Sequence, residues 1–179
     1  QLVAKEIFRM SDQVRDILKK TIELVKNEEV KSIDGLKENG EQVERLGKCI
    51  TEYLAALFSS GSLTEQQAAQ TASLMCVLSD VERMGTLSVE MAECMLERSD
   101  RKYKYTPEAM DELQKSLKVL NKMFCDSLKA LQGDDGIEPG KMMKRKDKLL
   151  DLDIKMRKAH IERVNKGKCK ASLTAPFTN

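Results

Sequence analysis

Apolar side chains recur at almost every third or fourth position over the first 26 residues, and this spacing constrains what the chain can fold into. It is the period of an amphipathic helix that buries one face. The positions in this stretch are Val3, Ile7, Met10, Val14, Ile17, Leu18, Leu24 and Val25. Similar stripes follow over about 30–57, 65–98, 107–131 and 138–164. The sequence therefore predicts an all-α protein built from long helices.

Short polar segments mark where these helices begin and end. Thr64 can cap the third helix, with Gln67 at the partner position of a capping box. Thr106 can cap the fourth helix, where Pro107 suits the first helical position. The stretch "QGDDGIEPG" after the fourth helix has the glycine and proline content of a loop. These signals support the helix boundaries that the apolar stripes predict.

The five helices are arranged in the sequence as a repeat. Residues 1–100 hold three of them and residues 101–179 hold two, followed by a stub that ends in "TAPFTN". An antiparallel three-helix bundle is the economical way to bury such stripes when connections are short. We therefore predict two tandem three-helix bundles, the second without most of its third helix. Part of the apolar surface of the second bundle should then be exposed, paired with another chain or covered by residues absent from this sequence.

Composition argues against several classes of protein. Tryptophan is absent, so the core is expected to be aliphatic. No apolar run approaches the roughly 18 residues that cross a bilayer, so the piece is expected to be soluble. A single histidine, His160, leaves little material for nucleophilic or histidine-based metal chemistry, and we expect no enzyme. The cysteines are odd in number and widely spaced, which predicts reduced core residues in a reducing compartment. They are Cys49, Cys76, Cys94, Cys125 and Cys169.

Positive charge is concentrated near the end of the chain. Residues 141–170 hold twelve Lys or Arg against four Asp or Glu, a net charge of +8 in a chain whose total is +2. Such a segment could bind phosphate, nucleic acid or an anionic membrane face. Its basic residues are interleaved with acids and no aromatic residue is available to stack on bases. We therefore expect a solvated helix face and no nucleic acid.

The third stripe contains the run Glu82-Arg83-Met84-Gly85, in which glycine interrupts a strong helical pattern. Glycine in a helix interior costs roughly 1 kcal/mol relative to alanine. The residue therefore indicates either close helix packing or a site that needs access to the backbone.

This run resembles the "E-R-hydrophobic-G-D" signature of the PhoU family of phosphate-signalling proteins. Two further stretches, "KEIFRMSDQVRDIL" near the start and "HIERVNKGKC" near the end, are similar to segments of the cytoplasmic PhoU-like domain of bacterial sodium/phosphate cotransporters. The resemblance covers essentially the whole chain in matching order. It implies two pseudo-symmetric three-helix bundles, with Glu82, Arg83 and Gly85 as signature residues.

Some PhoU-like proteins bind iron or zinc clusters through carboxylates, and the resemblance implies where such ligands would lie. Glu44 and Glu82 stand at two of the four expected positions of the first repeat. The other two hold Gly40 and Thr86, which cannot replace a carboxylate ligand. A charge pair or a hydrogen-bond network on the face of the bundle is the alternative for Glu82 and Arg83.

The second repeat offers fewer candidates for a metal. Asp147 and Asp151 have the i, i+4 spacing of a ligand pair, but they also fit a solvated pair flanked by lysines. His160 is expected to cap or pack the end of the fifth helix, and Arg163 to interact with the helix dipole. No cofactor is therefore predicted, and iron or zinc stays open as an alternative.

The resemblance implies a non-catalytic regulatory or interaction domain on the cytoplasmic side of the bacterial inner membrane. Its partners would be the transmembrane part of the same sodium-dependent phosphate transporter, or phosphate-signalling proteins, and a homodimer is conceivable. Three alternatives stay open: a free-standing PhoU-like regulator, a metal-binding helical domain, and a helical scaffold with affinity for nucleic acid.

Overall fold

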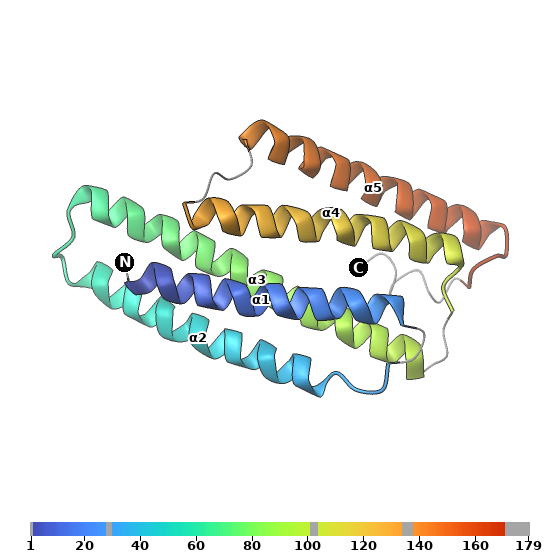
Figure 1. Ribbon diagram of the computed structural model, residues 1–179, viewed down its shortest axis with the longest axis horizontal. Coiled ribbons are helices and arrows are strands. Elements are labelled where there is room, and N and C mark those ends of the chain that lie inside the picture. Colours follow the sequence, from blue (N-terminus) through green and yellow to red (C-terminus); the bar gives the residue numbers. More distant parts are fainter. Residues whose placement is uncertain (1, 28–29, 101–103, 134–137, 171–179) are drawn as a thin grey trace. The chain divides into compact units, whose positions relative to one another are not determined.

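The computed structural model describes residues 2–27, 30–100, 104–133 and 138–170, which form five helices and no strand. The helices are α1 (Leu2–Lys26), α2 (Asp34–Ser59), α3 (Glu65–Asp100), α4 (Pro107–Leu131) and α5 (Pro139–Asn165) (Figure 1). The predicted all-α fold class is therefore confirmed, with three helices in the first predicted repeat and two in the second. The predicted third helix of the second repeat begins in "TAPFTN", which lies outside the described residues.

The beginning of α2 differs from the sequence prediction. The apolar stripe placed Val30 and Ile33 inside the helix, whereas α2 begins at Asp34. Ile33 is the cap residue, and its carbonyl accepts from the backbone N–H groups of Leu36 and Lys37. Val30 is buried ahead of the helix, where its N–H donates to Ser99 Oγ at 3.0 Å. Buried loop residues can thus continue the helical spacing of apolar residues in the sequence, so that the predicted helix begins too early.

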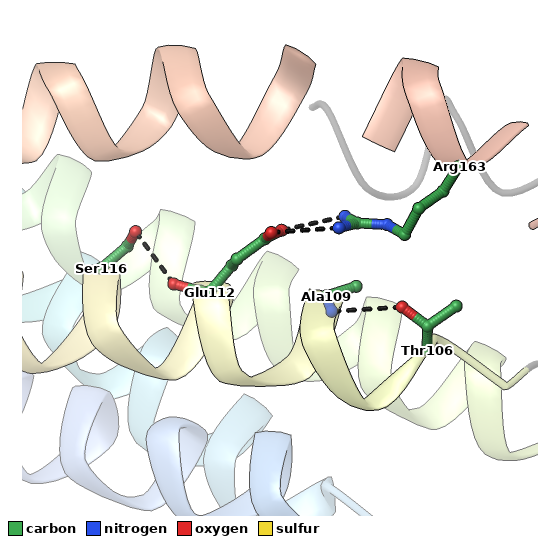
Figure 2. A network of polar contacts seen from close by, with 5 residues as sticks. All are labelled: Thr106, Ala109, Glu112, Ser116 and Arg163. Carbon is green, nitrogen blue, oxygen red and sulfur yellow. Dashed lines mark hydrogen bonds and ion pairs between the residues drawn. The ribbon is translucent and has the colours of Figure 1, made fainter. Parts of the chain in front are cut away.

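Both predicted caps are present. The backbone N–H of Thr64 donates to Gln67 Oε1 at 2.9 Å, and that of Gln67 donates to Thr64 Oγ1 at 3.3 Å. This reciprocal pair satisfies two N–H groups that the helix itself leaves without a partner. At the start of α4, Thr106 Oγ1 accepts from the N–H of Ala109 at 3.2 Å (Figure 2).

The chain divides into two compact units. The first unit comprises Gln1–Thr21 with Ile33–Met91, and the second comprises Ile22–Ser32 with Ala92–Asn179. Two of the three division points fall within helices, because α1 and α3 each contribute to both units, and the third lies just before α2. The predicted boundary at residue 100 separates sequence repeats rather than compact units, and it stays a prediction.

The first unit has an aliphatic core that α1, α2 and α3 share. Its largest fully buried side chains are Ile7, Met10, Ile17, Leu18, Leu54 and Leu78. A buried polar contact joins α1 to α3, because Thr21 Oγ1 donates to the carbonyl of Ser88 at 3.0 Å. The predicted stripe of α1 thus faces inward, as expected.

In the second unit, α4 and α5 run antiparallel and two ion pairs join them. Arg145 pairs with Asp126, near the end of α4 that leads to α5. Arg163 pairs with Glu112, toward the opposite end of the two helices. Between these pairs lie the buried Leu117 and Met156. The two bridges fix the register of the helices along their length.

The outward face of α5 carries large apolar side chains. They recur at steps of seven and four, and they are Met143, Leu150, Ile154 and Ile161. Within the described part of this single chain these side chains are exposed, and whether another chain or absent residues cover them stays a prediction.

The placement of the cysteines in the core was wrong. All five are thiols rather than disulfides, as predicted, but Cys49, Cys76 and Cys94 are exposed and the other two are half-buried. The core face of α2 follows Val43, Ile50 and Leu54, and a cysteine one residue before Ile50 points about 100° away from it. Proximity to apolar residues in the sequence therefore did not place these thiols inside.

No helix among the described residues is long and apolar enough to cross a membrane.

The cap of α4 can be tested by substitution. Thr106→Ala removes the acceptor of the Ala109 N–H and should lower the free energy of unfolding by about 1 kcal/mol. Thr51→Ala, at an exposed position within α2, is the matched control and should leave stability unchanged or slightly higher. Urea unfolding followed by circular dichroism measures both, and equal effects at the two positions would contradict the capping role.

Candidate functional site

Gly85 lies in the middle of α3, where this helix faces both α1 and α2 within the first unit. A Cβ atom at this position would stand 3.2 Å from Val14 Cγ2 and 3.4 Å from Val43 Cγ1. Both valines are buried. The glycine is therefore explained by close packing of three helices, the first of the two interpretations that its position allowed.

Two glycines of α2 make similar contacts with α3. A Cβ atom on Gly40 would stand 2.9 Å from Val89 Cγ2, and one on Gly47 would overlap the carboxylate of Glu82. The two glycines are seven residues apart, as are the two residues that they face, so one antiparallel register explains both contacts. We call Gly40, Gly47 and Gly85 together the glycine seam.

Glu82 extends along the glycine seam and is half-buried there. Its carboxylate occupies the space over Gly47 that any larger residue would fill. Burial raises the pKa of Glu82 above its ordinary value of 4.5, and the nearby negative charge of Glu44 raises it further. The structure thus brings together the two candidate carboxylates of the first repeat, with Glu44 on the exposed side.

Arg83 and Thr86 do not join this carboxylate pair. Arg83 is 65% exposed and its Nη1 lies 3.9 Å from Glu90 Oε1, an ion pair of small energy in water. Thr86 Oγ1 donates to the backbone carbonyl of Glu82 at 3.2 Å, within its own helix. The charge-pair alternative for Glu82 and Arg83 therefore takes a different form, since Arg83 lies near Glu90 whereas the carboxylate of Glu82 lies over Gly47.

The residues do not fit a multinuclear metal cluster. Among the described residues, no group of three or more His, Cys, Asp or Glu side chains is placed to hold a metal ion. Gly40 is taken up by helix packing, and two carboxylates alone do not complete the coordination of a hard cation. Binding of a single ion by Glu44 and Glu82 stays a prediction.

Asp147 and Asp151 lie on α5, in the second unit, and both are exposed. Asp151 Oδ2 accepts from Lys155 Nζ at 2.7 Å. This arrangement matches the solvated pair that the sequence left open as an alternative, and their role as metal ligands stays a prediction.

His160 is fully buried in the last turns of α5, as the packing interpretation expected. Burial lowers its pKa, and the positive charge of Arg163 lowers it further, while Glu112 acts in the opposite direction. The ring is therefore largely neutral near neutral pH.

Arg163 has a role that the sequence did not reveal. Its Nη1 and Nη2 donate to the two carboxylate oxygens of Glu112 at 3.0 and 2.9 Å, a bidentate contact between α5 and α4 (Figure 2). Hydrogen bonds to Glu112 raise the pKa of Arg163. Sequence spacing cannot identify such a pair, because it requires the register between two helices.

The glycine seam predicts a position-dependent effect of alanine. Gly85→Ala should lower the free energy of unfolding by about 1–3 kcal/mol, because the new methyl group meets two buried valines. Gly35→Ala is the control, since nothing lies within 4 Å of its Cβ position, and helix propensity there favours alanine by up to about 1 kcal/mol. A Gly85→Ala protein as stable as the Gly35→Ala protein would rule out close packing. Urea unfolding measures both.

The raised pKa of Glu82 predicts a pH-dependent effect of Glu82→Gln. Because the folded state binds this proton more tightly than the unfolded state, the ionised carboxylate destabilises the fold above its folded pKa. The variant should therefore be more stable than the parent at about pH 7, and this advantage should disappear at about pH 4. Urea unfolding of both proteins at the two pH values measures the difference. An advantage that persists unchanged at the lower pH would contradict the assignment.

Comparison with known proteins agrees with the resemblance drawn from the signature. The chain is 23% identical over 175 residues to the phosphate-specific transport system accessory protein PhoU homolog 1 of Thermotoga maritima. This alignment covers 98% of the present chain and 73% of the Thermotoga protein. No solved structure matches the chain at a comparable level of significance. Residues 7–95, which contain the glycine seam and the Glu82 to Gly85 signature, match the PhoU domain.

Proposed function

We propose that this chain is a non-catalytic regulatory module of phosphate transport, which acts through contacts made by its helices. The observation that carries the proposal is the match of residues 7–95 to the PhoU domain. The similarity to an accessory protein of a phosphate-specific transport system, over nearly the whole chain, supports it further.

The arrangement of the signature is consistent with a contact surface rather than a reaction centre. Gly85 and Glu82 take part in helix packing, whereas Arg83 faces outward. Leu87 and Glu90, four and seven residues further along α3, are also exposed. Residues at this spacing lie on one face of a helix. An apolar side chain between two opposite charges is suited to bind a partner protein.

The finer proposal is that the module is the cytoplasmic domain of a sodium/phosphate cotransporter and meets the transmembrane part of that protein. The stretches "KEIFRMSDQVRDIL" and "HIERVNKGKC" support it through their resemblance to such domains. A free-standing PhoU-like regulator is the alternative, and the similarity to the Thermotoga accessory protein fits this alternative as well as the cotransporter proposal or better. The coding sequence upstream of Gln1 distinguishes the two, because only the cotransporter encodes several hydrophobic spans there.

Deletion of the coding region for residues 1–179 tests the regulatory role in the organism that carries it. Uptake of radiolabelled phosphate should lose its dependence on the phosphate concentration in the growth medium. Restoring the region on a plasmid should restore that dependence. Uptake that responds to phosphate as in the parent strain would contradict the proposal.

The contact face of α3 can be tested in the same assay. Arg83→Ala should impair regulation without changing the free energy of unfolding by more than about 0.5 kcal/mol, because its ion pair is exposed. Arg45→Ala is the matched control, since Arg45 is also 65% exposed and pairs with Glu41 within its helix. Equal behaviour of the two variants in phosphate uptake would exclude a special role for Arg83.

A further inference from the structure

The second unit contains a cleft of about 710 Å³ between the end of α1, the end of α3 and the beginning of α4. The residues that line it come from four parts of the chain, all of them within this unit. Lys26 is the last residue of α1, and Lys31 lies between α1 and α2. Arg98 lies near the end of α3, and Lys104 lies just before α4. The volume falls within the range typical of small-molecule sites.

Positive charge dominates the described part of the lining of this cleft. Four described residues that line it are cationic, namely Lys26, Lys31, Arg98 and Lys104, and one is acidic, Asp111. Asp111 is already paired, because its Oδ2 lies 2.6 Å from Lys115 Nζ. Cations that face one concave site concentrate the electric field there and attract anions.

Arg98 gives the cleft a fixed cationic group. Only 7% of its surface is exposed, whereas the three lysines are exposed. Its Nη2 donates to the carbonyl of Asn27, and its Nη1 lies 3.4 Å from Met110 Sδ. The guanidinium also lies 5.9 Å from the ring centre of Tyr105. These contacts hold the guanidinium in one orientation, so that its positive charge is fixed beside the cleft.

The rest of the lining could also contact the less polar part of a larger ligand. Val25, Val30 and Pro107 provide apolar walls, and Tyr105 contributes a half-buried ring and a hydroxyl. Burial raises the pKa of Tyr105, so its hydroxyl keeps its proton and can donate a hydrogen bond. Basic groups beside apolar walls suit a ligand with a charged end and a less polar body.

We propose that this cleft binds the phosphate groups of a small anionic ligand, with Lys31, Lys104 and Arg98 as the principal cationic contacts. Inorganic phosphate and a phosphorylated metabolite share this chemistry. The cleft lies outside the glycine seam, and binding there does not depend on the regulatory role proposed above. Failure of the transport experiments and failure of ligand binding are therefore separate results.

Isothermal titration calorimetry of the full chain with inorganic phosphate and, separately, with ATP tests the proposal. At least one of the two should bind. Lys31→Gln with Lys104→Gln should weaken that binding about tenfold or more, because each lysine contributes a charge-assisted contact. Both lysines are exposed, so the variant should keep the circular dichroism spectrum and unfolding midpoint of the parent.

The control removes the same charge elsewhere in the unit. Lys118→Gln with Lys122→Gln alters two exposed lysines of α4 outside the cleft and should leave the affinity within about twofold of the parent. Tighter binding of ATP would identify a phosphorylated metabolite as the preferred class, and tighter binding of phosphate would identify the free ion. Binding of neither ligand, or equal losses in the two double variants, would overturn the proposal.

Discussion

The close approach of α3 to α2 and α1 is the contact on which the first unit depends. It is possible because Gly40, Gly47 and Gly85 lack side chains where the helices meet. Interiors are packed almost as densely as organic crystals, so one methyl group at such a point must displace a neighbour. The seam therefore explains why glycines persist in helices at a cost of roughly 1 kcal/mol each. The seam also sets the register between α2 and α3, and this register determines the contacts of the signature residues Glu82 and Gly85.

That register separates the roles of neighbouring residues. Glu82 extends over Gly47 and comes close to Glu44, which raises its pKa, while Arg83 faces outward with Glu90. Of these two neighbouring residues, Glu82 therefore takes part in helix packing and Arg83 lies on the surface. In the second unit, the pairs Arg145–Asp126 and Arg163–Glu112 set the corresponding register of α4 and α5.

Helical period and capping chemistry predicted the fold well, because both are local properties of the chain. The predicted helices end within a few residues of the observed ones, and the Thr64 and Thr106 caps have the expected partners. Properties that depend on contact between helices could not be predicted from the sequence in this way. Arg163 and Glu112 form a bidentate pair although they are 51 positions apart in the sequence. The cleft likewise brings together Lys26 and Arg98, which are 72 positions apart. The exposed cysteines show the same limit, since burial follows a helix face rather than apolar neighbours.

A double-mutant cycle between Gly85→Ala and Val14→Ala tests the packing of the seam most directly. If the added methyl group presses on Val14, shortening that valine should cost less in the Gly85→Ala background than in the parent. We expect a coupling energy of about 1 kcal/mol in urea unfolding. Effects that add to within about 0.3 kcal/mol would contradict the account, because they would mean that the two positions do not share a contact.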